Sequence, residues 1–258
     1  VKSDKLLALQ IPLPPLLEQH RIAAILNEQL TAVERARAAA EAQLQAAKAL
    51  PAAYLREVFE SEEARGWERV RLGEICEITA RQIDPKIPEY GALPHVNGEN
   101  IEGGTCRLTY LRTATEEGMI SGKYLFEPGD VLYSKLRPYL RKVVYVDFRG
   151  VCSADMYPIR VKPDALDPRF LTWLLVSNAF TDYADEESRR ARMPKLNREQ
   201  LFAWSAPLPT LEEQRRIAQH LADKMAKAEK TSKTLEAQLA AIEQLPAALL
   251  RRAFAGEV

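Results

Sequence analysis

The chain has 258 residues, and its 47% hydrophobic content is enough to bury a sizeable core, which excludes a disordered protein. Its 36 basic and 36 acidic residues give a formal net charge of zero, which excludes nucleic-acid binding through the overall charge. Any affinity for nucleic acid must therefore come from local basic patches.

Cysteine usage and hydropathy bound the cellular context. The three cysteines, Cys76, Cys106 and Cys152, are odd in number and form no CxxC motif, so neither a disulfide framework nor a zinc site is predicted. No stretch approaches the roughly 18 to 20 apolar residues of a membrane span, and the first residues lack the features of a signal peptide. We expect a cytoplasmic protein with no membrane partner.

One segment occurs twice, once near each end of the chain. The sequence PLPPLLEQHRIA at 12–23 returns as PLPTLEEQRRIA at 207–218, and at the same offset LPAAYLREVF (50–59) matches LPAALLRRAF (245–254). Nearly half of the positions between these limits are identical, which is far beyond chance for an internal repeat. Two copies of one helical element therefore bracket one unique domain.

Each copy opens with Pro-Leu-Pro and continues into a run rich in Ala, Leu, Glu, Gln, Lys and Arg. Because proline is excluded from helix interiors, the opening prolines predict helix starts, and the runs predict helices over about 16–50 and 211–245. Pro51 and Pro246 occupy equivalent positions, so each run is predicted to break or kink there and to continue as a short second helix.

Apolar residues recur every seven positions in both copies, which is the spacing of a coiled-coil seam. We predict that the two helices pair antiparallel, because the intervening domain returns the chain; two independent amphipathic helices on a globular core are the alternative. The predicted helix-pairing seam consists of Leu26, Leu30, Val33, Leu44, Leu221, Met225, Leu235, Leu239 and Ile242.

Between the repeats, from Trp67 to about Ala206, the composition shifts toward β-branched, aromatic, Gly and Pro residues. Short apolar runs at 143–148 and 156–161 predict strands, and 168–184 predicts a helix that begins at a proline and covers the sheet. The chain is therefore predicted to be an α+β protein, in which a mixed α/β domain is flanked by two long helices.

Two segments of this domain concentrate basic side chains, at 129–142 and 188–201. Arginine and lysine bind phosphates, and arginine and asparagine contact guanine and adenine bidentately, so both segments are candidate DNA contacts. A solvated charged face is the alternative for either segment alone. The candidate residues are Lys135, Arg137, Tyr139, Arg141, Lys142, Arg189, Arg190, Arg192, Lys195 and Asn197.

No catalytic or metal site is predicted. The Gly-rich segment 95–105 matches neither common phosphate-binding pattern and is better explained as turns. His20, His95 and His220 are scattered, and Asp130 near Lys135 lacks the second acidic ligand that a metal-dependent nuclease needs.

The repeated PLPxLxEQxRIA motif before a heptad helix, WERVRLGEI at 67–75, GDVLYSKLRPYLRK and RMPKLNREQL together resemble the specificity subunit of type I restriction-modification systems. The resemblance covers essentially the whole chain. It implies target recognition domains that each read one half of a split DNA sequence, and an antiparallel helical rod that sets their separation and binds methyltransferase subunits.

By this resemblance, residues 1–11 are the tail of a preceding recognition domain, 12–62 the first helical spacer, 63–206 the recognition domain and 207–258 the second spacer. The family usually has two recognition domains, whereas this chain has one. It is expected to be a C-terminal half or a half-length subunit that forms a homodimer, and the start at Val1, within a domain, favours the fragment.

The resemblance implies a non-catalytic protein of phage defence that binds double-stranded DNA, with Arg137, Arg192, Lys195 and Asn197 as the first candidates for base contacts. It binds no cofactor itself: the partner modification subunit carries S-adenosylmethionine and methylates adenine, and a restriction subunit cleaves. Two alternatives are the recognition portion of a fused type II-like restriction/modification enzyme and a coiled-coil scaffold that binds protein.

Overall fold

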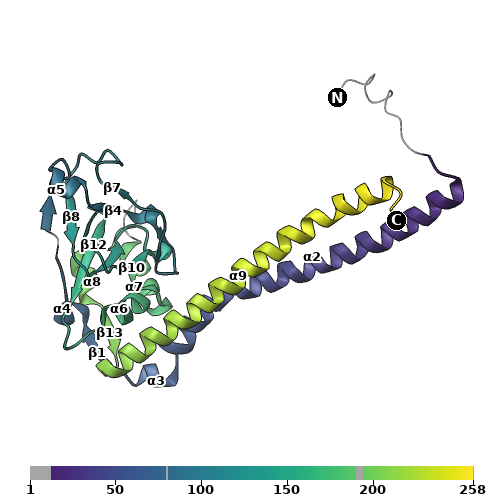
Figure 1. Ribbon diagram of the computed structural model, residues 1–258. Coiled ribbons are helices and arrows are strands. Elements are labelled where there is room, and N and C mark those ends of the chain that lie inside the picture. Colours follow the sequence, from purple (N-terminus) through teal and green to yellow (C-terminus); the bar gives the residue numbers. More distant parts are fainter. Residues whose placement is uncertain (1–12, 80, 190–193, 258) are drawn as a thin grey trace. The chain divides into compact units, whose positions relative to one another are not determined.

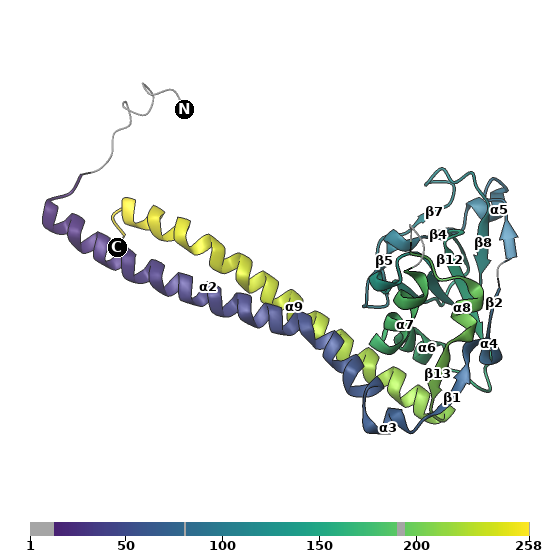
Figure 2. The same ribbon diagram turned by 180° about the vertical axis from the view of Figure 1, so that it is seen from behind.

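The structure is a computed structural model that describes residues 13–79, 81–189 and 194–257. It contains two compact units, one formed by the described residues of 1–49 and 227–258 and the other by 50–226 (Figures 1 and 2). The first unit is purely helical, and the second combines sheets and helices. Together they form the predicted α+β protein.

Most of the elements between the two long helices are short. They are α3 (Glu62–Arg65), β1 (Glu68–Arg71), α4 (Leu72–Ile75), β2 (Cys76–Ile78), β3 (Arg81–Ile83), α5 (Pro88–Gly91), β4 (Pro94–Val96), η1 (Gly98–Asn100), β5 (Ile101–Glu102), β6 (Arg107–Leu108), β7 (Arg112–Thr113), β8 (Lys123–Phe126), β9 (Val131–Ser134), η2 (Pro138–Leu140), β10 (Val143–Tyr145), β11 (Gly150–Cys152), β12 (Met156–Val161), α6 (Pro168–Val176), α7 (Asn178–Ser188), α8 (Arg198–Ala203) and β13 (Ser205–Leu208).

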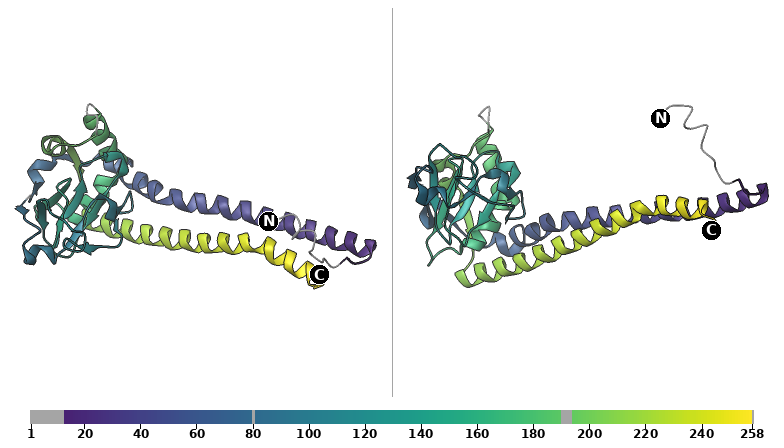
Figure 3. Two further views of the ribbon diagram at one scale, coloured as in Figure 1. Left: turned by 90° about the horizontal axis from the view of Figure 1, so that it is seen from above. Right: turned by 45° about the horizontal axis from the view of Figure 1, so that its top comes forward.

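The helical unit is built from the first part of α2 (Leu16–Phe59) and the last part of α9 (Leu211–Phe254). The two helices run side by side in opposite directions, which confirms the predicted antiparallel pairing (Figure 3). Lys48 on α2 and Glu236 on α9 form an ion pair, with 2.8 Å between Nζ and Oε1. Both side chains are half-exposed, so this pair fixes register more than it adds stability.

The predicted seam residues divide between the two units. Val33 and Leu44 are buried in the helical unit, and Leu26, Leu30, Leu235, Leu239 and Ile242 are half-buried there. Leu221 and Met225 instead pack on the hydrophobic core of the mixed unit. Their position shows that α9 serves two purposes: its start belongs to the domain, and its remainder belongs to the helix pair.

Of the break or kink predicted at Pro51 and Pro246, the break into a separate short second helix is wrong. Both prolines lie inside continuous helices that end at Phe59 and Phe254, beyond the predicted ends at 50 and 245. A proline removes one backbone hydrogen bond and crowds the carbonyl four residues earlier, which a long helix can absorb by bending when its flanks are well packed. The flanks here are Ala-rich and favour helix strongly.

Two sheets form the framework of the mixed unit. One has the strand order β10-β9-β12-β2 and is antiparallel throughout; the other has the order β3-β8-β11-β4-β7, with β11 and β4 parallel. The strand predicted over 156–161 is β12, with the same limits, and the strand predicted over 143–148 is β10, which ends at Tyr145. Smaller pairs join β1 to β13 and β5 to β6.

Strand β9 lies between two hydrophobic layers. Val131 and Tyr133 belong to the core that includes α6 and α7, whereas Leu132 belongs to a second core with Phe126 and Val96 of the other sheet. Because successive side chains of a strand point to opposite faces, an uninterrupted apolar run predicts burial on both sides. The run Val-Leu-Tyr therefore fixes the order of layers as helices, first sheet, second sheet.

The helix predicted over 168–184 is two helices, α6 and α7, separated at Ser177, so this prediction is wrong in its continuity. Ser177 has extended backbone angles, its Oγ donates to the Leu174 carbonyl, and the Phe180 amide donates to its Oγ. A serine that caps a new helix competes with helix continuation. The apolar face was predicted correctly, since Phe170, Leu174 and Phe180 are fully buried.

The long helices are anchored in this domain at one end of each. Leu55 and Phe59 of α2 and Ile217, Ala218 and Leu221 of α9 are buried in the core that contains Phe170. The ring centroids of Phe59 and Phe170 are 5.8 Å apart, a distance typical of favourable aromatic pairs. The anchor residues come from the repeat itself, so the repeated motif includes a domain-binding surface.

The remaining sequence expectations concern the cysteines, the glycines and membrane spans. All three cysteines are free, and burial raises the pKa of the Cys76 thiol to about 12. The segment 95–105, predicted to consist of turns, contains the end of β4, the 3-10 helix η1, strand β5 and a turn in which Gly104 has a φ of 74°. Neither the long helices nor any other helix among the described residues combines the length and apolarity that a membrane span requires.

Leu44 offers a test of the seam, because its side chain is only 6% exposed. Leu44→Ala is expected to lower the free energy of unfolding by about 2–4 kcal/mol, since it leaves a cavity between packed side chains. Urea denaturation followed by circular dichroism measures the change. The neighbouring Gln43→Ala, at an exposed position, should change it by less than about 0.5 kcal/mol, and equal effects of both variants would contradict the assignment of Leu44 to the seam.

Candidate nucleic-acid interface

The two basic segments meet in the structure. Leu136 and Lys195 form an antiparallel bridge, the Arg137 amide donates to the Pro194 carbonyl at 2.9 Å, and the Leu196 amide donates to the Lys135 carbonyl at 2.9 Å. We call the resulting pair of strands, residues 135–137 and 194–196, the basic clamp. It converts two separate charge runs into one local surface.

The loop after the clamp has an unusual backbone. Arg137 and Arg141, which flank the 3-10 turn η2, have φ angles of 51° and 49°, in the left-handed region that non-glycine residues rarely adopt. Each such residue costs on the order of 1 kcal/mol, so the surrounding contacts must impose the conformation. The turn exposes Tyr139, whose side chain is 51% accessible.

The first residue of the clamp, Lys135, makes its contacts inside the domain. Its side chain is buried, its ammonium donates to the Ala154 carbonyl and lies 4.0 Å from an Asp155 carboxylate oxygen, and Nζ is 5.1 Å from the centre of the Tyr157 ring. Burial lowers the pKa of Lys135, and the nearby positive charges of Lys195 and Arg198 lower it further. The Lys135 ammonium is therefore occupied by partners inside the domain, and Lys135 supports the clamp structurally.

Arg141 and Lys142 are also committed to internal contacts. The Arg141 guanidinium donates to the Val176 carbonyl at the end of α6 and to Asn178 Oδ1 at 2.8 Å. A cation at a helix C-terminus complements the helix dipole. The Lys142 ammonium donates to the Gly98 carbonyl, so these two residues fasten the loop to α7 on one side and to segment 97–100 on the other.

The other candidate residues are on the surface. Arg137, Tyr139 and Lys195 are exposed around the clamp, Arg189 is exposed at the end of α7, and Asn197 is exposed while its Oδ1 accepts from the Gln200 amide as the cap of α8. Arg190 and Arg192 lie outside the described residues. The structure adds Arg198, an exposed residue of α8 that the sequence prediction omitted.

A local positive field exists here although the chain has no net charge. Lys195 and Arg198 each lie close enough to Lys135 to lower its pKa. Lys195 and Arg198 are both exposed, and no ion pair joins either of them to a carboxylate among the described residues. Such a cluster of unneutralised cations is what a phosphate backbone requires.

The structure shows what Asp130, the acidic residue of the segment 129–142, contacts. Asp130 is fully buried and accepts two hydrogen bonds of 2.9 Å from the Arg160 guanidinium and one from the Glu127 amide. This bidentate pair raises the pKa of Arg160. Asp130 therefore closes a turn between β8 and β9 and has no free oxygen pair for a metal ion.

The histidines have no shared site. His95 is buried, its Nδ1 lies 2.7 Å from Glu117 Oε2, and burial lowers its pKa. His20 and His220 lie on the exposed faces of α2 and α9. Within the described ranges, no three His, Cys, Asp or Glu side chains gather where they could hold a metal ion.

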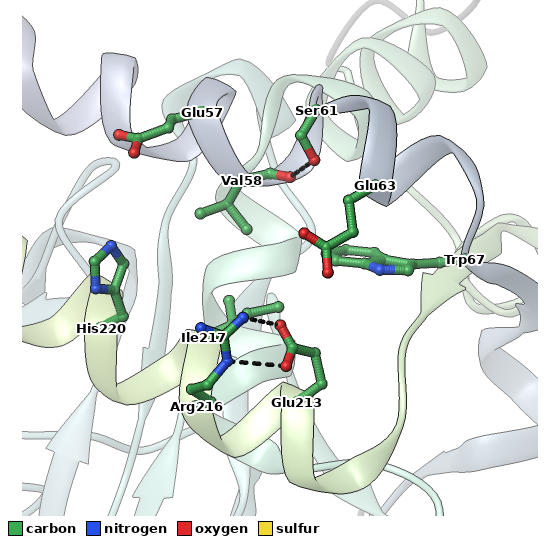
Figure 4. Close-up of a pocket in the computed structure, with 9 residues that line it drawn as sticks. All are labelled: Glu57, Val58, Ser61, Glu63, Trp67, Glu213, Arg216, Ile217 and His220. Atoms are coloured by element: carbon green, nitrogen blue, oxygen red, sulfur yellow. Dashed lines mark hydrogen bonds and ion pairs between the residues drawn. The ribbon is translucent and has the colours of Figure 1, made fainter.

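A groove of about 180 Å³ lies between the end of α2 and the start of α9, within the mixed unit. Val58, Ile217 and Trp67 form its apolar part, and its rim carries Glu57, Glu63, Glu213, Arg216 and His220 (Figure 4). Glu213 is paired with Arg216, and Glu57 with Lys224 at 2.8 Å. The carboxylates on this rim disfavour a polyanion, so the groove suits a protein contact rather than DNA.

A family of known proteins matches most of the chain. The family described as "Type I restriction modification DNA specificity domain" matches residues 64–241. The specificity subunit of the type I restriction enzyme EcoDI from Escherichia coli is 34% identical over 192 residues, which are 74% of this chain and 42% of that protein. The HindI specificity subunit from Haemophilus influenzae is 26% identical over 162 residues, 58% of this chain and 33% of that protein. The chain thus spans less than half the length of these relatives.

Two solved structures share the fold. A chain from a structure described as "Structural basis underlying complex assembly and conformational transition of the type I R-M system" matches with a TM-score of 0.73 and 26% identity, over 96% of this chain and 62% of that one. The HsdS subunit from Thermoanaerobacter tengcongensis matches with a TM-score of 0.59 and 27% identity, over 96% and 60% of the two chains. In both cases the likeness includes the helices as well as the mixed unit.

Lys135 and Lys195 provide a matched pair within the clamp, one buried and one exposed. Lys135→Ala is expected to lower the free energy of unfolding by about 1–3 kcal/mol, because it removes a buried side chain and its hydrogen bond to the Ala154 carbonyl. Lys195→Ala should change it by less than about 0.5 kcal/mol. Thermal unfolding of both variants measures the difference, and an equal loss of stability would contradict the division of roles.

Proposed function

Since the chain belongs to the type I restriction-modification DNA specificity domain family, we propose that residues 63–206 bind double-stranded DNA and read one half of a bipartite target. The observation that carries this proposal is the basic clamp, whose backbone pairing brings the exposed residues Arg137 and Lys195 together just before the exposed Arg198 of α8. Among the described residues, no ion pair joins any of these three cations to a carboxylate. The clamp lies inside the segment that the family match covers.

In this proposal, the exposed cations hold the duplex and a few side chains select its sequence. Lysine and arginine contacts to phosphates are independent of sequence and fix orientation, whereas bidentate contacts to base edges in the major groove discriminate by about 1–3 kcal/mol each. Arg137 is the candidate for such a base contact, because its backbone is fixed by the clamp and its side chain is exposed. Lys135, Arg141 and Lys142 support the loop from behind.

The chain itself makes and breaks no covalent bond in this proposal. A modification subunit binds S-adenosylmethionine and methylates adenine, and a restriction subunit cleaves the DNA. The helix pair and the groove beside Trp67 are the surfaces that we assign to the modification subunit, because both lie apart from the clamp in sequence and the groove has an apolar floor.

The repeat supports a second recognition domain at the far end of the helix pair. Identical residues in the two copies have different environments: Phe59 is 7% exposed in the core, whereas its counterpart Phe254 is 68% exposed, and Leu55 and Leu250 differ in the same way. Leu16, the counterpart of the half-buried Leu211, is also exposed. Among the described residues, the anchor that holds one domain is thus present a second time with its apolar residues exposed.

Gln19 and Gln214 repeat this difference in hydrogen bonding. Gln214 is buried, its Nε2 donates to the carbonyls of Pro209 and Ala165, and its Oε1 accepts from the Asp167 amide. Within residues 13–79, 81–189 and 194–257, Gln19 keeps only the first of these bonds, from Nε2 to the carbonyl of Pro14, the counterpart of Pro209. A domain of the same kind would supply the missing carbonyl and amide.

DNA binding by the clamp predicts a dependence on salt that follows the number of phosphate contacts. The logarithm of the binding constant should fall linearly with the logarithm of salt concentration, with a slope of roughly −0.9 per contact. Replacing Arg137, Lys195 and Arg198 by Ala should reduce the magnitude of this slope by about two to three. Fluorescence anisotropy with a labelled duplex measures it.

The control removes equal charge elsewhere, by replacing Lys227, Lys230 and Lys233 of α9 with Ala. It should leave the slope unchanged. Binding that depends on salt equally in both triple variants would place the DNA elsewhere, and an absence of salt-dependent binding by the unaltered chain would favour the protein-binding scaffold. Methyl transfer by the isolated chain would contradict the assignment of a non-catalytic recognition subunit.

A second domain predicts a two-part target. Sequencing of methylated sites in DNA from cells that co-express the chain with its modification subunit should give a motif interrupted by an unspecified spacer. Leu250→Ser with Phe254→Ser should abolish this motif, because both residues belong to the unoccupied anchor. Arg251→Ala, on an exposed neighbour, is the control, and an uninterrupted motif would contradict the second domain.

A further inference from the structure

A second surface element borders the clamp loop, and neither the sequence prediction nor the family comparison assigns it a role. It is the segment 109–113, which carries Tyr110 and Arg112 at the end of the β5–β6 hairpin. Tyr110 is 77% exposed, among the most exposed aromatic side chains of the described residues. The Arg112 guanidinium carbon lies 5.8 Å from the centre of the Tyr110 ring.

The position of Tyr110 is fixed by a built network. Asn97 and Asn100 cap each other's backbone, with the Glu99 amide donating to Asn97 Oδ1 and the Asn97 amide donating to Asn100 Oδ1 at 2.9 Å. The same Asn100 donates from Nδ2 to the Tyr110 carbonyl at 3.1 Å and accepts the Thr109 amide at its own carbonyl. An exposed aromatic residue on so ordered a support is preorganised for contact.

Hydrogen bonds join the β5–β6 hairpin and the segment before it to Arg141 and Lys142 after the turn η2. The Gly104 amide donates to the Arg141 carbonyl at 2.9 Å, and Lys142 donates to Gly98. At Gly103 a side chain is excluded, because an added Cβ would lie 2.4 Å from the Leu140 carbonyl oxygen. The hairpin and the turn that exposes Tyr139 therefore form one continuous surface at the ends of β4 and β9.

Arg112 has the electrostatic freedom to bind a phosphate. It is exposed, and no carboxylate of the described residues lies within ion-pair distance of it. The nearby Glu116 carboxylate accepts hydrogen bonds from the amide and hydroxyl of Thr113, and these bonds together with the charge of Arg112 lower the pKa of Glu116, so Arg112 is close to this carboxylate without forming an ion pair with it. By contrast, Arg107 in the same hairpin is paired with Glu102 at 2.7 Å.

Arg112 also borders an open hollow of about 310 Å³. Pro94, Leu111 and Phe148 give it an apolar floor. Its margin carries Arg112, Glu116 and Arg149, of which Arg149 is paired with Glu127 at 3.2 Å, so Arg112 is the cation left for a phosphate. A deoxyribose with its phosphate has this combination of an apolar face and an anionic edge. Half or more of protein–DNA hydrogen bonds go to sugar and phosphate, so a hollow of this kind suits a backbone contact.

We infer that Tyr110 and Arg112 form a second DNA contact of this domain, in which Arg112 binds a backbone phosphate and Tyr110 packs against the adjoining sugar and base edge. This inference rests on the proposed function, because it concerns the same duplex that the clamp binds. It assigns two residues that lie 19 and 17 positions before the first basic segment (129–142) in the sequence and join the basic segments only through the fold.

Binding of the full chain to a duplex that contains its mapped target, and to an unrelated duplex, tests the inference. Arg112→Ala should weaken both complexes about tenfold and reduce the magnitude of the salt slope by about one. Tyr110→Ala should weaken the target complex more than the unrelated one. Arg107→Ala is the matched control and should bind within about twofold of the unaltered chain, and melting temperatures should show that all three variants are folded.

The outcomes separate this inference from the proposed function. If the unaltered chain binds DNA in a salt-dependent way and the Tyr110 and Arg112 variants bind equally well, the inference is wrong and the clamp remains the DNA site. If Arg107→Ala weakens binding as much as Arg112→Ala, the effect reflects general charge and the inference is also wrong. If the unaltered chain does not bind DNA, both proposals fail.

Discussion

The surface of the mixed unit depends on one backbone junction, the pairing of residues 135–137 with 194–196. Without it the two basic segments would be separate loops, and the strained turn around Pro138 would lose the contact that holds Arg137 in the left-handed region. The junction is supported from below by Lys135 and by Tyr157, whose hydroxyl donates to the Leu196 carbonyl. A few hydrogen bonds thus position every exposed residue of the clamp.

The basic residues of this junction divide into two groups by burial. Lys135, Arg141 and Lys142 spend their donors on backbone carbonyls or on Asn178, where an unmade bond would be costly in a poorly solvated site. Arg137, Lys195 and Arg198 remain exposed. This division explains how a chain with no net charge can present a local positive surface, since the acidic residues are distributed over the helices and other loops.

The sequence was sufficient for the features that depend on periodicity and on the repeat. Heptad spacing predicted two long antiparallel helices, and the apolar run at 156–161 predicted β12 with its limits. Local competition was harder to predict: Ser177 ends α6 through its side chain, and the helices continue through Pro51 and Pro246 because their Ala-rich flanks favour helix. Burial of Lys135 could not be predicted, because the carbonyl that binds it comes from Ala154 on another strand connection.

The spacing of residues in the sequence could not predict the contacts among distant segments either. Tyr110, Tyr139 and Lys195 come together only because the segments that follow β4 and β9 and the bridged segment 194–196 before α8 are hydrogen-bonded to one another. No local sequence pattern encodes these contacts. The repeat, in contrast, carried more information after the structure was known, because identical residues such as Phe59 and Phe254 could be compared in two environments.

The most direct test of DNA binding at the clamp is site-specific photocrosslinking to a duplex that carries the mapped target. A benzophenone amino acid replaces Tyr139 beside the clamp in one variant and the exposed Leu245 of α9 in another. The account predicts a crosslink to DNA from position 139 that unlabelled target duplex removes by competition, and none from position 245. A crosslink from position 245 alone would contradict it.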